Sequence, residues 1–330
     1  MGALMRTRAA ILVCIFAVLL VVAVLQPLKM ERRELPIGEG AAGPTVPAEA
    51  FKNPWHEGEV LLVGIGDSVT RGYGASPGRS YFELLHRNDD AACPEMRGCD
   101  LAHVFPNLRV LNLAIDYTVS EEHLTLQVPK LPKHPPAVRG VVVITTGGND
   151  LIHDYGEGVP RDGALYGCTA RQAEVWREHF RSRLGAILDR VLLAFPGGCD
   201  IFLANIFDPT DGEGDIENAG LGLPQWPDGL EALALFNEAI ADACATRERV
   251  HLIDMHALFL GHGIHCRDKG SPHYREDDPH YWYFANLEDP NDRGYDAIRR
   301  AFLREMIRVL APRASGKKTG DGTAPLDREP

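Results

Sequence analysis

The stretch Val60–Gly72, VLLVGIGDSVTRG, decides the fold of this chain. It begins with an apolar run, Val60–Ile65, which has the length of a buried strand and ends at glycine and polar residues. Gly66 and Gly72 allow a tight backbone around Ser68, which falls where the strand turns into a helix. The hydroxyl of a serine in such a turn can face solvent, and backbone N–H groups of the next helix can point at a developing negative charge. A simple helix cap is the alternative use of this serine.

Four further apolar runs of strand length follow the first one, and helical patterns alternate with them. The clearest helix begins at Thr169, where Thr169 and Gln172 have the spacing of a capping box. Strands that alternate with helices predict a parallel sheet covered on both faces, in a three-layer α/β domain. Ligands of such sheets bind beyond the carboxyl ends of the strands. The four runs are Val110–Ala114, Val141–Thr145, Ile201–Ile206 and Val250–Ile253.

The composition and the N-terminus indicate where the chain acts. The 330 residues carry 46 acidic and 34 basic side chains, a net charge of −12, which disfavours nucleic acid as a partner. Residues 9–28 are uncharged and about 20 residues long, the length of a membrane-spanning helix. We expect residues 1–28 to be a signal anchor or signal peptide, which places the rest outside the cytoplasm, either membrane-anchored or secreted. Residues 29–55 are expected to be a linker, 56–312 the domain and 313–330 a disordered tail.

Six cysteines follow Cys14, and an even number in an exported chain predicts disulfides. Cys93 and Cys99 flank PEMRG and are expected to close a small loop. A metal site is the alternative, but paired CxxC spacing is missing, so we expect neither a metal nor a cofactor. The acidic stretch 208–217 begins like a calcium loop but lacks its glycine and its closing glutamate, so we expect a solvated loop near the mouth of the site.

A second polar motif follows the third apolar run, which ends in TTGGND. Asn149 is expected at the sheet edge where Ser68 lies, and a side-chain amide there can donate to an oxyanion. An ordinary Gly-Gly-Asn-Asp turn is the alternative. The GxSxG elbow of α/β-hydrolases and the GxxxxGK[ST] phosphate loop are both absent from this region.

Together these two motifs resemble the SGNH (GDSL) hydrolase family. The first block of the family is matched by GDS at 66–68, and its GxND block by GGND at 147–150. The resemblance covers about residues 58–311 and implies a flavodoxin-like sheet, a serine nucleophile, and ester hydrolysis or acyl transfer without a metal. By this resemblance Ser68 is the nucleophile, and its backbone N–H and the side chain of Asn149 hold the oxyanion.

The chain departs from the family pattern in two places. The second block of the family offers a glycine after the second strand, where LNLAIDYTVS places Tyr117 or its neighbour. The backbone N–H that would serve the oxyanion is still present, but a non-glycine residue cannot adopt every φ without an energetic cost. The last block, DxxHPN, is matched by NLEDPN, so that Asp289 stands where the histidine would be. The ordinary pKa of an aspartate, near 4, is too low for a base that acts on serine.

We therefore expect a histidine from a neighbouring segment. His280 follows Asp277 by three residues, which reproduces the DxxH spacing, so His280 is expected to take the Ser68 proton and Asp277 to orient the imidazole. The alternatives are that no histidine is catalytic, or that the base is one of His256, His262 and His273.

The expected function is that of an extracytoplasmic serine esterase or lipase-like hydrolase acting on a small-molecule, lipid or carbohydrate ester. An acyltransferase or deacetylase acting on envelope polysaccharide would use the same residues, and a non-catalytic binding protein would keep the fold without a usable histidine. Five aromatic residues are candidates for an apolar acyl-binding wall or for the core: Trp226, Tyr281, Trp282, Tyr283 and Phe284.

Overall fold

The computed structural model describes residues 41–156 and 162–312. Within them, five strands form one sheet in the order β2-β1-β3-β4-β5, and every pair of neighbours is parallel. The expected five-stranded parallel α/β architecture is therefore confirmed. The strands are β1 (Glu59–Ile65), β2 (Leu108–Asn112), β3 (Val138–Ile144), β4 (Cys199–Ala204) and β5 (Val250–Ile253).

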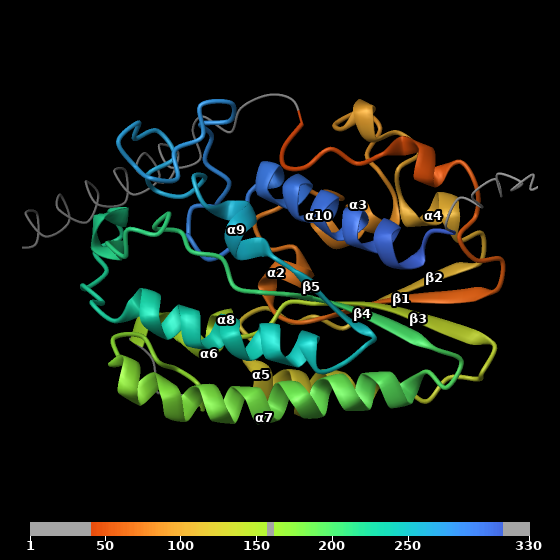
Figure 1. The fold of residues 1–330 in the computed structure, drawn as a ribbon, viewed down its shortest axis with the longest axis horizontal. Coiled ribbons are helices and arrows are strands. Elements are labelled where there is room, and N and C mark those ends of the chain that lie inside the picture. Colours follow the sequence, from red (N-terminus) through yellow and green to blue (C-terminus); the bar gives the residue numbers. More distant parts are fainter. Residues whose placement is uncertain (1–40, 157–161, 313–330) are drawn as a thin grey trace, which may run out of the picture.

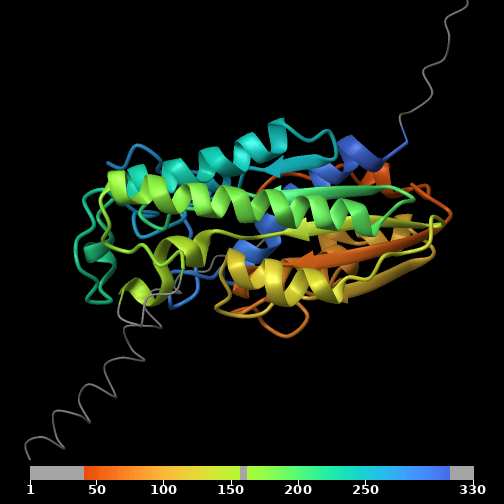
Figure 2. The ribbon, with the colours of Figure 1, turned by 90° about the horizontal axis from the view of Figure 1, so that it is seen from below.

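Helices cover both faces of the sheet (Figure 1). On one face, α7 (Ala170–Ala194) and α8 (Gly229–Ala245) lie side by side, as the view of Figure 2 shows. On the other face lie α3 (Tyr81–His86), α4 (Leu101–Val104) and α10 (Asp292–Leu310). The expected capping box at the start of α7 is present, because the side chains of Thr169 and Gln172 each accept the backbone N–H of the other.

The remaining elements are short, and three of them directly follow strands at their carboxyl ends. These are α2 (Ser68–Arg71) after β1, α6 (Gly148–Ile152) after β3 and α9 (Met255–Phe259) after β5. The others are α5 (Ser120–Glu122), the π-helix η3 (His123–Gln127) and the 3-10 helices η1 (Ala48–Phe51), η2 (Pro94–Met96), η4 (Val128–Lys130), η5 (His153–Gly156) and η6 (Ile216–Ala219).

The edge strand β2 lies two residues earlier than the apolar run that predicted it. Val110 is 39% exposed, because an edge strand is covered on fewer sides than a central one. The strand ends at Asn112, whose side chain accepts the N–H of Ala114 at 3.0 Å and donates to the carbonyl of Thr70 at 3.1 Å. Beyond Asn112 the backbone still runs beside β1, since the N–H groups of Leu113 and Ile115 donate to the carbonyls of Gly64 at 2.8 Å and Gly66 at 3.1 Å, although these residues lie outside the strand.

Part of the expected linker packs on the domain. Trp55 lies edge-on against Phe105, with ring centroids 5.7 Å apart, and the N–H of Ala42 donates to Asp296 of α10 at 3.3 Å. Residues 41–55 therefore contribute to the core. The expected signal segment, residues 1–28, and the expected tail, residues 313–330, lie outside the described residues; within the described ranges, no helix is both long and apolar enough to cross a membrane.

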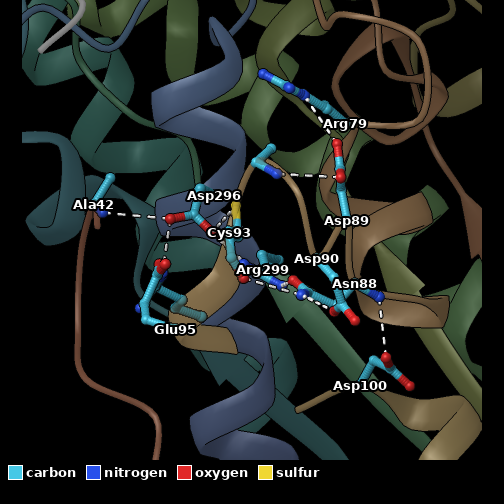
Figure 3. Close-up of polar contacts among 12 residues, drawn as sticks. Ala42, Arg79, Asn88, Asp89, Asp90, Cys93, Glu95, Asp100, Asp296 and Arg299 are labelled. Carbon is cyan, nitrogen blue, oxygen red and sulfur yellow. Dashed lines mark hydrogen bonds and ion pairs between the residues drawn. The ribbon is translucent and has the colours of Figure 1, made fainter. Parts of the chain in front are cut away.

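The expected disulfide between Cys93 and Cys99 is not formed, and all six cysteines of the described residues are free. The two thiols have different partners. Cys93 Sγ lies 3.9 Å from Oδ1 of Asp296, toward which it points in Figure 3, and Cys99 Sγ lies 3.9 Å from the carbonyl oxygen of Arg97. The disulfide predicted from the number and spacing of the cysteines is thus wrong, because spacing along the chain does not determine which way the side chains face.

The surroundings of Cys93 form an ion-pair network. Cys93, Glu95 and Asp296 approach one another as metal ligands would. Asp296, however, already pairs with Arg299 at 2.7 Å and with Arg300 at 2.9 Å, and Arg300 also pairs with Glu95. These two cations balance both carboxylates, so the cluster ties the loop that carries Cys93 to α10.

Candidate active site

Ser68 is the first residue of α2 and directly follows the turn at the carboxyl end of β1. Asp67 caps this helix, since its Oδ1 accepts the N–H of Val69 at 3.1 Å and the hydroxyl of Thr145 at 2.8 Å. Gly66 has a φ of 144°, and a Cβ atom there would lie 2.3 Å from the carbonyl oxygen of Thr145. The backbone around Ser68 is therefore fixed by a glycine that no other residue can replace without a shift.

Asn149 lies in α6, and Ser68 and Asn149 line the same pocket. They meet because β1 and β3 are neighbours whose carboxyl ends, Ile65 and Ile144, are in register. Asn149 is 8% exposed, and its Nδ2 donates to the carbonyl oxygen of Thr118 at 3.1 Å. A side-chain amide has two N–H donors, so one is left for a ligand.

Tyr117 precedes Thr118 in the loop that follows β2. Its φ is 64°, in the left-handed region, which costs a non-glycine residue about 1 kcal/mol. The backbone at this position thus has the conformation that glycine adopts most easily, although the residue is tyrosine. The side chain is 53% exposed.

A buried polar network holds these three loops together. The side chain of Gln127 both accepts from the N–H of Gly66 at 2.9 Å and donates to its carbonyl at 2.8 Å. His123 contacts Thr118 at 3.0 Å through Nε2 and Thr146 at 2.9 Å through Nδ1. Burial lowers the pKa of His123 to about 3, so the ring is neutral and both nitrogens are occupied. The sequence patterns did not single out Gln127 or His123, whose roles arise from contacts between distant segments.

The expected pair of His280 and Asp277 does not form. His280 Nδ1 hydrogen-bonds to Asp278, and Arg293 Nη2 donates to the same oxygen of Asp278 at 2.8 Å, while Asp277 is exposed. The chain from Asp278 to His280 has neither helix nor turn, and side chains two residues apart face the same side of an extended segment. The described residues that line the pocket around Ser68 include neither His280 nor Asp277. The other histidine candidates, His256, His262 and His273, are also outside this lining.

Asp289, which is 2% exposed, does not line the pocket either, but its carboxyl group lies beside the Ser68 side chain. Its Oδ2 accepts the side-chain amide of Asn286 at 2.7 Å, and its Oδ1 receives no hydrogen bond of ordinary geometry. Ser68 is nevertheless close enough for its side chain to stabilise the charged carboxylate. Burial raises the pKa of Asp289 to about 7, the hydrogen bonds from Asn286 and Ser68 oppose the rise, and the charges of Asp67 and Glu288 add to it. The ordinary aspartate pKa that spoke against Asp289 as a base therefore does not apply at this buried position.

The pocket next to Ser68 is mostly apolar. Among the expected aromatic wall residues, Trp226 lines it, whereas Tyr281, Trp282 and Tyr283 are buried in the core. Glu288 also lines it, and burial raises the pKa of its carboxyl group to about 7. The apolar lining further includes Leu151, Ile152, Ile206, Phe207, Leu230 and Leu233.

The acidic stretch 208–217 is only partly the solvated loop that we expected. Asp211 is fully buried and accepts the backbone N–H groups of Gly261 and Gly263, both at 2.8 Å, and of His265 at 2.9 Å. The carboxylate is thus occupied by the chain itself, and it fixes the segment after α9 against the loop after β4.

The chain is similar to a known family and to several solved structures. A family model described as the GDSL-like Lipase/Acylhydrolase family matches residues 65–297. The lipase Lip_vut3 from a goat rumen metagenome is 16% identical over 74% of this chain and 95% of its own, with a TM-score of 0.46. Phospholipase A1 from Streptomyces albidoflavus NA297 is 18% identical over 76% and 99%, with a TM-score of 0.43. The extracellular lipase from Streptomyces rimosus is 15% identical over 77% and 100%, with a TM-score of 0.42. No curated protein matches the chain.

Proposed function

Because this chain belongs to the GDSL-like lipase/acylhydrolase family, we propose that it hydrolyses carboxylic esters with Ser68 as the nucleophile. The observation that carries the proposal is the position of Ser68. The residue stands on a glycine-fixed turn, in one pocket with Asn149 and beside the buried carboxyl group of Asp289. A hydroxyl nucleophile, an amide donor and a proton acceptor are the three groups that acyl transfer to serine needs.

The oxyanion of the tetrahedral intermediate would be held by three donors. These are the backbone N–H of Ser68, the free side-chain N–H of Asn149 and the backbone N–H of Tyr117. Asn149 keeps its other N–H on Thr118 at 3.1 Å, which fixes the amide before substrate arrives. Fixed donors of this kind need no rearrangement as charge develops on the carbonyl oxygen.

The pocket suggests the kind of ester. Its walls are aliphatic and aromatic side chains such as Leu233 and Trp226, and they favour an apolar acyl chain by removing it from water. We propose an aliphatic or lipid ester as substrate, with water as the acyl acceptor. The place of action that we propose is outside the cytoplasm, since residues 9–28 have the composition of a signal or anchor.

The proposal is tested with a fluorophosphonate serine probe and a series of p-nitrophenyl esters of increasing chain length. The full-length protein should bind the probe covalently and hydrolyse the esters, and Ser68→Ala should do neither while unfolding at nearly the same temperature. Ester hydrolysis by Ser68→Ala within about tenfold of the wild-type rate would contradict the assignment.

A further inference from the structure

We infer that Asp289 is the general base of this site: its carboxylate takes the Ser68 proton in place of a histidine, and Asn286 is the positioning residue that orients it. This inference rests on the proposed function and assigns the proton transfer that the proposed function leaves open. It replaces a histidine–aspartate pair by an aspartate–asparagine pair at the same spacing, Asn286 and Asp289 being three residues apart.

The first support is the rigid geometry of the loop. Asn286 Nδ2 donates to Asp289 Oδ2 at 2.7 Å, and Asn286 Oδ1 accepts the N–H of Asp289 at 3.2 Å. The carbonyl of Asp289 accepts the N–H of Phe284 at 2.6 Å, and Pro290 forms a bridge with Tyr283. The carboxyl group is thus held from both ends of a short loop, with the Ser68 side chain as its neighbour.

The second support is the electrostatic setting of Asp289. The carboxyl groups of Asp67 and Glu288 and the phenol groups of Tyr295 and Tyr117 lie near enough to interact with it electrostatically, and none of these is a cation. Burial among such groups disfavours the charged carboxylate, so the pKa of Asp289 is raised to about 7. A base is most effective when its pKa lies near the working pH, and this carboxyl group meets that condition.

The third support is the state of two histidines, His280 and His123. His280 is engaged with Asp278, which also pairs with Arg293. His123, the histidine inside the loop network, uses both ring nitrogens on threonine hydroxyls and is neutral. In contrast, Oδ1 of Asp289 has no hydrogen bond of ordinary geometry and is free to receive a proton.

Two proton transfers accompany each half of the reaction. Asp289 removes the proton from Ser68 Oγ as Oγ attacks the ester carbonyl carbon. The C–O bond to the alcohol then breaks, and protonated Asp289 gives its proton to the departing alkoxide. In the second half, Asp289 takes a proton from water while the water oxygen attacks the acyl carbon, and it returns that proton to Ser68 Oγ as the acid leaves. One ester and one water thus give one acid and one alcohol.

The main test compares Asp289→Asn with the wild type and Ser68→Ala, using probe labelling and p-nitrophenyl butyrate hydrolysis. Asp289→Asn should lower both rates by about 10²–10⁴-fold, the contribution of a general base. The matched control is Asp100→Asn, which alters another buried carboxyl group. The carboxylate of Asp100 accepts the N–H of Asn88 and that of His103, which lies in α4. This variant should keep the wild-type turnover per folded molecule.

The outcomes separate this inference from the proposed function. Loss of activity in Ser68→Ala together with wild-type rates in Asp289→Asn would overturn the inference and leave the proposed function standing. A large loss in His280→Ala with none in Asp289→Asn would identify His280 as the base. Activity that survives Ser68→Ala would overturn both.

A measurement on the wild type covers the case in which Asp289→Asn fails to fold. The rate of ester hydrolysis should fall below about pH 7 as Asp289 is protonated. The midpoint of that fall should hardly move between 10 and 35 °C, because carboxyl ionisation has little enthalpy, whereas the pKa of an imidazole falls clearly on warming. A midpoint that falls on warming would overturn the inference. Asn286→Asp, which adds a second carboxyl group beside Asp289, should move the midpoint to higher pH.

Discussion

The side-chain amide of Asn149 donates a hydrogen bond of 3.1 Å to the carbonyl oxygen of Thr118. This bond joins the segment after β3 to the loop after β2 and lies one residue from Tyr117. The donors proposed for the oxyanion come from three different loops, and this contact fixes the distance between two of them. A single side chain therefore has two separable effects, one on loop structure and one on the proposed chemistry.

Asn149→Ala should lower kcat by about 10²–10³-fold, because it removes one oxyanion donor, and should lower stability by about 1 kcal/mol through the lost hydrogen bond. The measurements are steady-state kinetics and urea unfolding. Asn112→Ala is the matched control, since Asn112 also donates to a backbone carbonyl, that of Thr70, at 3.1 Å but lies outside the pocket lining. It should lose at least as much stability, because its side chain also accepts the N–H of Ala114 at 3.0 Å, and keep kcat. Equal kcat losses in both variants would argue against the oxyanion role.

Gly66→Ala should destabilise the protein by about 2–4 kcal/mol, because the new Cβ would lie 2.3 Å from the carbonyl oxygen of Thr145 and the backbone must shift. Gly78→Ala is the control: Gly78 also has a positive φ, 80°, but a Cβ there meets nothing within 4 Å. This variant should lose only about 1 kcal/mol from backbone strain. Chemical denaturation of both variants gives the comparison, and equal losses would show that the contact with Thr145 is not decisive.

Asp289→Asn should make the folded protein more stable at high pH. The pKa of Asp289 is about 7 in the folded state against an ordinary value of 3.8, so the folded state binds the proton more tightly than the unfolded one. The wild type therefore loses stability as pH rises from about 4 to about 7, by at most about 4 kcal/mol. The gap between variant and wild type should widen over that range and stay constant above it. Thermal unfolding from pH 4 to 9 measures the gap, and one that is independent of pH would contradict the buried carboxylate.

Thiol counting on denatured protein without reductant should find all six described cysteines as free thiols, because the structure pairs none of them. In the native protein the reaction should be slow, since burial raises the pKa of Cys244 and Cys266 to about 12 and so removes the reactive thiolate. Two or fewer thiols in the denatured protein would restore the disulfides that the cysteine count suggested.

The sequence alone was sufficient for the sheet, its helical layers and the family. Strand runs such as Val60–Ile65 and the capping box at Thr169 depend on neighbouring residues, and such patterns are local. Ser68 and Asn149 could be placed at one sheet edge because the carboxyl ends of parallel strands share that edge. The glycine position of the family could be narrowed to Tyr117 or its neighbour, and the left-handed backbone conformation is found at Tyr117.

Only the tertiary structure decided which acidic group lies beside Ser68 and what state it is in. The DxxH spacing of Asp277 and His280 did not predict their contacts, because His280 hydrogen-bonds to Asp278 instead. Asp278 is also held by a hydrogen bond from Arg293 of α10. The ordinary pKa of aspartate was the wrong value for Asp289, because burial removes water from the carboxyl group and so raises its pKa. Burial is created by segments that are far apart in sequence, and no local pattern records it.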